Sequence, residues 1–188
     1  MLKKSAFLGF MIVLFAVSAF AAPPRDVNIA SNALANVADN GWTVLEFPAQ
    51  PPGEYYLEMS DLTGQSIGCW GAQTDEYPDG SAYQDDEQLD GDYKMQYTPT
   101  GGEPADLINI PAQGAIGDSW YPFGLQEAET SIGQTFVAPQ EFVAVGFSTP
   151  TWNTADSGCT LTLYAPSNIS SVDIRGKVTS TWGKLKFE

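Results

Sequence analysis

The residues that could carry chemistry include Gly64-Gln-Ser66-Ile-Gly68, which has the spacing of the nucleophile turn of serine hydrolases. A serine nucleophile of this kind needs a base, which is usually histidine, and the chain contains no histidine. The flanking residues indicate strands, whereas the hydrolase turn joins a strand to a helix. We therefore predict an ordinary turn at these residues.

Carboxylates are the second group of candidates, because 23 Asp and Glu stand against 8 Lys and Arg. They are dense in residues 75–92, and the part that begins at Asp86 approximates the start of an EF-hand calcium loop. The twelfth position of that loop is Tyr97, where glutamate is expected, and flanking helices are not predicted. We prefer a solvated acidic loop, and the alternative is a structural calcium site held by Asp86, Asp90 and Asp92.

The carboxylates could also indicate a glycoside hydrolase, since glycoside hydrolysis needs two carboxyl groups at a suitable separation. Nothing in the sequence selects a pair from 23 acidic residues. We assign no catalytic residue, expect no enzyme, and keep a glycoside hydrolase as the weakest alternative.

Aromatic side chains are the remaining candidates, because the C–H faces of sugars stack on rings while sugar hydroxyls bond to Asp, Asn and Gln. We expect most rings to be core, including Trp42 and Trp182, which occupy equivalent places in a repeated motif. Trp152 and Asn153 lie in a polar segment where exposure is expected. The candidate glycan-binding residues are Trp152, Asn153, Trp120, Tyr121, Tyr77 and Tyr83.

The elements that must position these side chains are short strands separated by Gly, Pro, Asp and Asn. Apolar and polar residues alternate in residues 45–47, 92–97 and 159–164, which is the period of a strand with one buried face. Further strands are predicted at 55–60, 131–137 and 142–147. The fold class is therefore all-β, as a two-sheet antiparallel jelly-roll sandwich.

A repeat suggests how the chain is organised. Residues 37–47 and 178–187 carry Trp, Leu and Phe at the same spacing, so parts of two copies of one module are present. We predict a back half in residues 22–97, a linker or long loop in residues 98–106, and a front half in residues 107–188. Either the halves complete one another as a permuted domain, or the chain is a fragment.

The first 21 residues predict a cleaved secretory signal, with Lys3 and Lys4, an apolar run, and small residues before the cleavage point. A membrane span is the alternative, but the run is shorter than the roughly 20 residues that a bilayer needs. Cleavage leaves six basic against 23 acidic side chains, which disfavours nucleic acid and anionic membranes as partners. We predict a secreted or cell-surface protein without membrane contact after cleavage.

Two features bear on assembly. Cys69 and Cys159 lie one in each half, and they form either a disulfide, which secretion permits, or two buried thiols. Basic residues crowd the last fourteen positions, so the basic end of one chain could attract the acidic body of another, although a solvated surface is the simpler interpretation.

Several motifs resemble a known family. Residues 132–139, 145–152 and 157–164 are similar to the front of jelly-roll modules of secreted bacterial multidomain proteins, often found beside glycoside hydrolases. Residues 37–47, 52–60, 77–83 and 91–92 resemble the back of those modules, so the order of the halves is reversed here. The resemblance implies a carbohydrate-associated or cell-surface accessory module without an assigned catalytic role.

The leading hypothesis is thus a secreted, non-catalytic module that binds a polysaccharide or cell-surface glycan. The second is a structural surface protein that self-associates by strand exchange between half-modules, because open sheet edges accept added strands.

Overall fold

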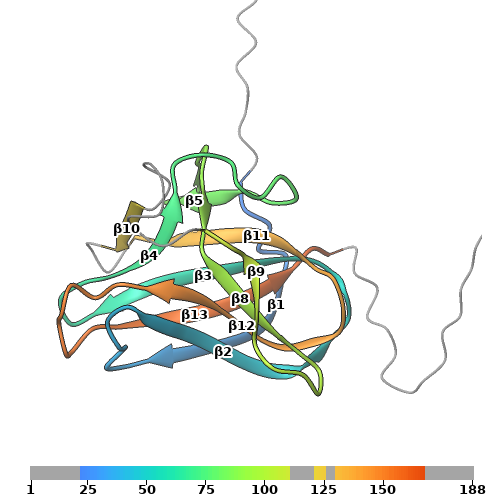
Figure 1. Cartoon of the computed structure of the whole chain (residues 1–188), viewed down its shortest axis with the longest axis horizontal. Helices are drawn as coiled ribbons and strands as arrows, with labels where there is room; N and C mark the ends of the chain where they lie inside the picture. Colours follow the sequence, from blue (N-terminus) through green and yellow to red (C-terminus); the bar gives the residue numbers. More distant parts are fainter. Residues whose placement is uncertain (1–21, 111–120, 126–129, 168–188) are drawn as a thin grey trace, which may run out of the picture.

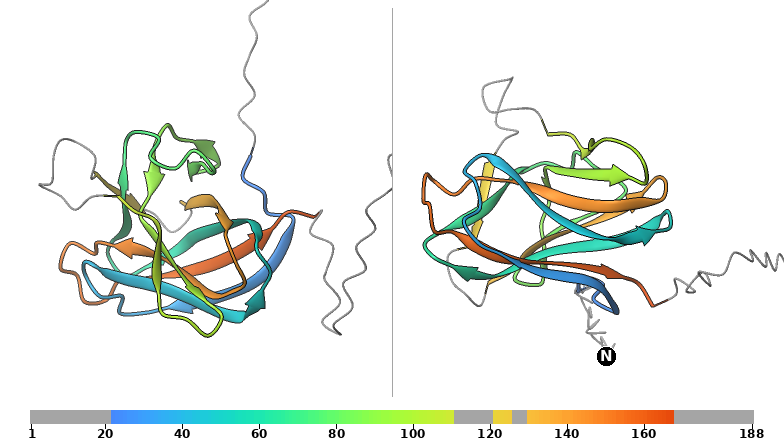
Figure 2. Two further views of the ribbon diagram at one scale, coloured as in Figure 1. Left: turned by 45° about the vertical axis from the view of Figure 1, so that its right-hand side comes forward. Right: turned by 90° about the horizontal axis from the view of Figure 1, so that it is seen from below.

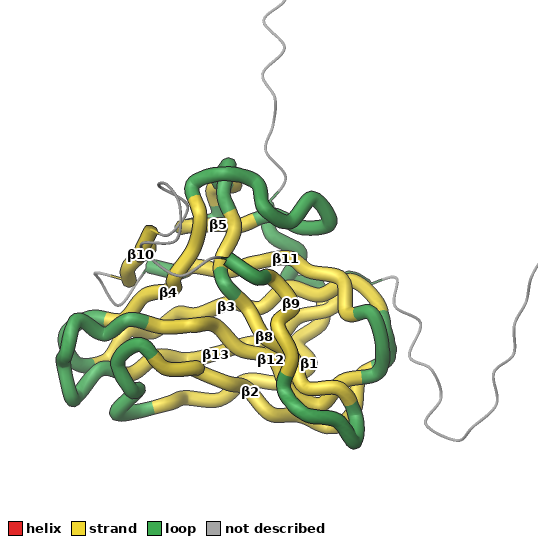
Figure 3. Tube along the Cα trace, in the orientation of Figure 1, coloured by secondary structure: helices red, strands yellow, loops and turns green. Residues whose placement is uncertain are grey.

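The computed structural model describes residues 22–110, 121–125 and 130–167. These residues form strands and loops without a helix, so the chain is all-β there, as predicted (Figure 3). No helix within the described ranges is long and apolar enough to cross a membrane. The predicted signal (1–21) and the second copy of the repeat (178–187) lie outside the described residues.

The strands form three antiparallel sheets (Figure 1). The six-stranded sheet has the order β1 (Val27–Leu34), β13 (Gly158–Ala165), β3 (Gly53–Thr63), β11 (Ile132–Ala138), β5 (Ala82–Gln84) and β6 (Glu87–Gln88). The four-stranded sheet has the order β2 (Gly41–Gln50), β12 (Phe142–Thr149), β8 (Met95–Pro99) and β9 (Ala105–Ile108). The three-stranded sheet has the order β10 (Tyr121–Leu125), β4 (Ile67–Ala72) and β7 (Asp92–Tyr93).

The six-stranded and four-stranded sheets lie face to face over one core, which is consistent with a β-sandwich (Figure 2). In β2, Leu45 and Phe47 are buried and Glu46 is exposed, so the predicted alternation is confirmed. Phe142 of the four-stranded sheet lies with its ring 5.2 Å from Phe47 and 5.0 Å from Tyr55 of the opposite sheet. Such edge-to-face contacts join the two layers.

Strands from the two predicted halves alternate in both large sheets. β11 pairs with β3 and β5, β12 lies between β2 and β8, and β13 lies between β1 and β3. Within the described residues, the two predicted halves therefore share one core.

Residues 98–106, predicted as a linker or long loop, form a hairpin between β8 and β9 in the structure. These residues form the end of β8, a turn in which Gly102 N donates to Pro99 O at 3.0 Å, and the start of β9. Gly101 has a φ of +72°, a left-handed conformation that glycine adopts without strain. The Pro and Gly content that suits a linker suits a hairpin turn equally well.

Cys69 on β4 and Cys159 on β13 are free, buried thiols in this structure, the second of the two alternatives given by the sequence. Burial raises the pKa of Cys159 to about 12. Burial also raises the pKa of Cys69, and the nearby charge of Cys159 acts in the same direction. Neither thiol should ionise at neutral pH, so both are expected to be unreactive in the folded protein.

We predict that a chromogenic disulfide reagent at about pH 8, near the ordinary pKa of a thiol, detects no thiol in the folded chain. Two thiols per chain should appear after unfolding in denaturant without reductant. An unfolded chain that still shows none would mean that Cys69 and Cys159 are joined by a disulfide.

Candidate ligand-binding site

A row of hydrogen-bonded residues places two tryptophans on the same face of the sheets. Trp42 of β2 lies opposite Ser148 of β12. Ser148 N donates to Lys94 O at 3.0 Å, and Lys94 N donates to Trp70 O of β4 at 2.7 Å. Residues opposite one another in antiparallel strands point to one face, so Trp42, Ser148, Lys94 and Trp70 share it. The row crosses three strand spacings, about 14 Å in all.

Trp152 belongs to a tight turn between β12 and β13. Thr154 N donates to Thr151 O at 3.1 Å, and Thr151 N is held by Asp39 Oδ1 at 2.6 Å. Trp152 and Asn153 have φ of 50° and 62°, both left-handed. A left-handed backbone costs an L-residue about 1–2 kcal/mol, and bulky side chains rarely adopt it. Such strain is concentrated at functional sites.

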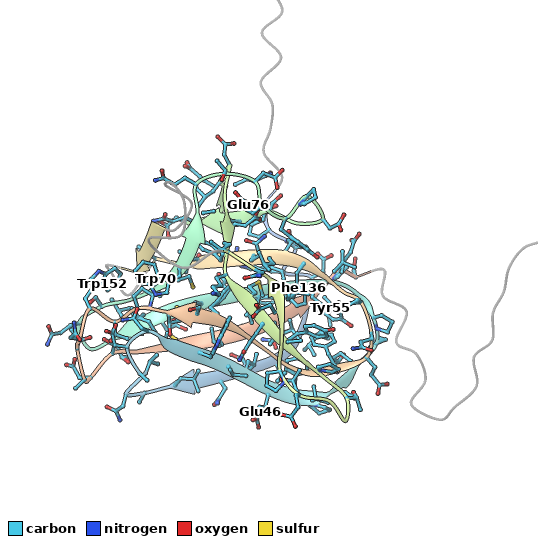
Figure 4. The ribbon with its side chains drawn as sticks, in the orientation of Figure 1. Glu46, Tyr55, Trp70, Glu76, Phe136 and Trp152 are labelled. Carbon is cyan, nitrogen blue, oxygen red and sulfur yellow. The ribbon has the colours of Figure 1, made fainter. Side chains whose placement is uncertain are left out.

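The indole of Trp152 lies over the face that carries Trp70. A Cβ added to Gly124 of β10 would lie 3.2 Å from Cη2 of Trp152. Gly124 pairs with Gly68 of β4, two residues from Trp70, so these positions point to one side of the ladder. Figure 4 shows Trp152 and Trp70 toward the same end of the molecule.

The three side chains differ in how they are held. Trp152 is 46% exposed and Trp42 is 39% exposed. Trp70 is half-buried, and its Nε1 donates to Asn40 Oδ1 at 2.9 Å, which fixes the orientation of the ring. Asn40 lies just before β2, so this bond ties β4 to the start of the strand that carries Trp42. We call Trp42, Trp70 and Trp152 the tryptophan face.

A groove of about 540 Å³ lies on the outer face of the four-stranded sheet. On β12 its floor is Ala144, and Gly146 follows it on the same face. A Cβ on Gly146 would lie 2.3 Å from the Thr43 carbonyl oxygen, so this position accepts no larger residue without a shift of the backbone. We call this groove the β12 trough; its walls include Val44, Glu46, Gln96, Thr98, Pro104 and Val143.

Comparison with known protein families, with curated proteins and with solved structures finds no match. The resemblance to jelly-roll accessory modules therefore remains a prediction from sequence motifs.

The sequence candidates divide into those on the tryptophan face and those elsewhere. Trp152 and Asn153 are together in the exposed turn. Tyr121 begins β10, opposite Gly71 of β4, but its side chain is outside the described part of the chain, as is all of Trp120.

Tyr77 and Tyr83 serve the packing around the six-stranded sheet. Tyr83 is 6% exposed, and its ring meets Tyr56 edge-to-face at 5.7 Å. The hydroxyl of Tyr77 accepts a hydrogen bond from Val137 N at 3.1 Å. The structure therefore does not bring this pair to Trp152.

The sequence reasoning missed Trp42 and Trp70 as site residues. Trp42 lies on the same outward face of β2 as Val44 and Glu46, and this period of two was a usable signal for its exposure. Trp70 gave no such signal, because β4 shows no polar alternation and the other five residues of the strand are buried.

The three calcium candidates do not form a ligand set in the structure. Asp86 Oδ1 accepts from Arg25 at 2.5 Å, and Asp92 is saturated by protein donors. Asp90 is exposed and borders a pocket of about 140 Å³ together with Asp75 and Asp92. Within the described residues, no group of three Asp, Glu, Cys or His side chains is arranged to hold a metal ion.

Proposed function

We propose that this chain is a secreted, non-catalytic β-sandwich module of jelly-roll type that binds a polysaccharide or cell-surface glycan through the tryptophan face. The observation that supports this most directly is Trp152. Its indole is held outward by a left-handed turn, on the face that also carries Trp70 and Trp42. A folded protein gains no stability from exposing an indole on a strained backbone, so selection for ligand contact explains the arrangement.

The chemistry of the face suits sugars. Indole rings stack against the C–H faces of pyranoses, and neighbouring polar groups bond to hydroxyls. Ser148 and Lys94 lie between Trp42 and Trp70, and Asn153 lies beside Trp152. The site therefore combines apolar platforms with polar groups.

A binding role is favoured over hydrolysis by the state of the buried carboxylates. Glycosidases need an acid with a raised pKa that reaches the substrate. Burial does raise the pKa of Asp92, against the opposing effect of its hydrogen bonds from Gln134 and from the backbone of Glu76 and Tyr77. Those three donors occupy its carboxylate, and Arg25 occupies the buried carboxylate of Glu58. Neither group is available as a general acid.

The deciding experiment is retention of the mature chain on a panel of cellulose, xylan, mannan, starch, chitin and pectin. Trp152→Ala should weaken binding to a retained polysaccharide by about tenfold, because one stacked ring contributes about 1 kcal/mol or more. Trp152→Asn should weaken it equally while tolerating the left-handed backbone better than tryptophan does. The thermal unfolding temperature of this variant should therefore not fall.

The matched control is Val27→Ala, since Val27 is 43% exposed on the edge strand β1. This variant should bind as the parent does. Failure of the parent to be retained on any member of the panel, or unchanged binding by Trp152→Ala, would overturn the proposal.

A further inference from the structure

We infer that the β12 trough continues the tryptophan face, and that the ligand is an extended, uncharged polysaccharide chain lying along β12. This inference rests on the glycan binding proposed above. It adds the length of the ligand, its direction on the sheet and its charge.

The two surfaces are continuous along β12. Ser148, Gly146 and Ala144 follow one another on one face of the strand, and Ser148 is opposite Trp42. Two residues along a strand span about 7 Å, so the trough begins one such step from the tryptophan row. The face at Trp42 therefore opens directly into the trough.

Along the trough, each small residue of β12 has a larger side chain on the strand at either side. Val44 and Gln96 flank Gly146, and Glu46 and Thr98 flank Ala144. The central strand thus carries the small residues while both neighbouring strands carry longer ones. A groove of this shape runs parallel to β12 and fits a linear chain better than a single sugar.

The polar groups of the trough specify hydroxyl partners. The Glu46 carboxylate accepts hydrogen bonds only, and the Gln96 amide both donates and accepts. Sugar hydroxyls can satisfy both groups, and Glu46 stands near the lower edge of the molecule in Figure 4, open to solvent. The trough is therefore equipped to bond to a polyhydroxylated chain.

Electrostatics argue against a polyanionic chain. Glu46 lines the trough on the β2 side, and Asp106 is exposed on β9 opposite Gln96, so a carboxylate lies on each side of the central strands. In the described ranges the basic residues are Arg25 and Lys94; Arg25 is engaged by Glu58 and Asp86, and Lys94 lies in the tryptophan row, outside the lining of the trough. An acidic polymer would meet like charge along the trough, whereas a neutral polymer would not.

The test measures affinity against chain length by titration calorimetry. The probes are cello-, xylo- and manno-oligosaccharides from disaccharide to hexasaccharide, with oligogalacturonides of equal length as the anionic set. We expect affinity of the parent to rise with length by about tenfold or more for one neutral series, and the anionic series to bind more weakly. The double variant Glu46→Ala/Gln96→Ala should keep the disaccharide affinity and lose about tenfold for the hexasaccharide, because two hydrogen bonds are removed.

The matched control is Glu87→Ala/Gln88→Ala, the same change of composition on the exposed strand β6. It should behave as the parent does. Three results would overturn the inference while leaving binding at the tryptophan face intact. They are an affinity that does not depend on chain length, an equal affinity for the anionic series, and an unchanged length dependence in the Glu46/Gln96 variant. A loss of about tenfold in the affinity of Trp152→Ala, combined with a length effect that needs Glu46 and Gln96, would support both proposals. A parent that binds no oligosaccharide or polysaccharide would remove both.

Discussion

Replacing Gly133 by alanine is expected to lower the free energy of unfolding by about 3 kcal/mol, the upper range for overpacking a well-ordered interior. Gly133 lies in β11 between β3 and β5, and a Cβ there would be 2.3 Å from the Tyr56 hydroxyl oxygen and 2.4 Å from its Cζ. The ring cannot move aside easily, because it is 1% exposed, stacked on Tyr164 and met edge-on by Tyr83. Urea unfolding measured by tryptophan fluorescence gives the free energy.

Two variants make this result specific to the overlap with Tyr56. Gly102→Ala, in the exposed β8–β9 turn, should change stability by about 0.5 kcal/mol or less. The double variant Gly133→Ala/Tyr56→Leu should recover part of the loss, since the shorter side chain leaves room for the new methyl group. If Gly133→Ala alone unfolds at the same urea concentration as the parent, the packing of Tyr56 on this glycine is wrong.

The strand predictions are confirmed where they rest on the alternation of neighbouring residues. The period of two is set by neighbouring residues, so Tyr93, Met95 and Tyr97 could be placed inward from the sequence, and all three are buried. The same segment shows the limit of local reasoning, because Lys94 divides it into β7 and β8, which join different sheets.

The tryptophan face depends on distant pairings that no local pattern encodes. Trp42 meets Ser148, and Lys94 joins Ser148 to Trp70, only after strands far apart in sequence take their register. Trp152 was identified because its neighbours in the chain are polar. Its left-handed conformation, which distinguishes it most clearly, occurs in a turn that is anchored by the bond between Thr151 and Asp39, a contact that the sequence alone did not reveal.

The acidic segment illustrates a different limit, because composition reports how many carboxylates are present and not what they bond to. Residues 75–92 suggested either solvent or calcium as the partner. Asp92 instead accepts hydrogen bonds from the protein itself, so we expect its carboxylate to contribute to the stability of the fold.

Replacing Asp92 by alanine is expected to destabilise the fold by about 2–3 kcal/mol, because the buried amide of Gln134 and two partly buried backbone N–H groups lose their acceptor, and a buried donor without a partner costs about 1–3 kcal/mol. Asp92 Oδ2 accepts from Glu76 N and Tyr77 N, both at 2.8 Å, and Oδ1 accepts from Gln134 Nε2 at 2.8 Å. Gln134 is fully buried, so water cannot replace the lost acceptor. Asp92→Asn should also be destabilising, because its amide nitrogen would face donors. Chemical unfolding monitored by circular dichroism measures both variants.

The control is Asp90→Ala, which removes an exposed carboxylate two residues away and should change the free energy of unfolding by about 0.5 kcal/mol or less. Repeating both measurements with millimolar calcium separates the structural role of Asp92 from the calcium alternative. A site that used Asp90 and Asp92 would stabilise the parent when calcium is added, and either substitution would abolish that gain. Equal losses for the two variants, present only with calcium, would show that Asp92 acts as a metal ligand. A large loss for Asp92→Ala alone, unchanged by calcium, would show that its carboxylate acts as the acceptor that ties β7, the β4–β5 loop and β11 together.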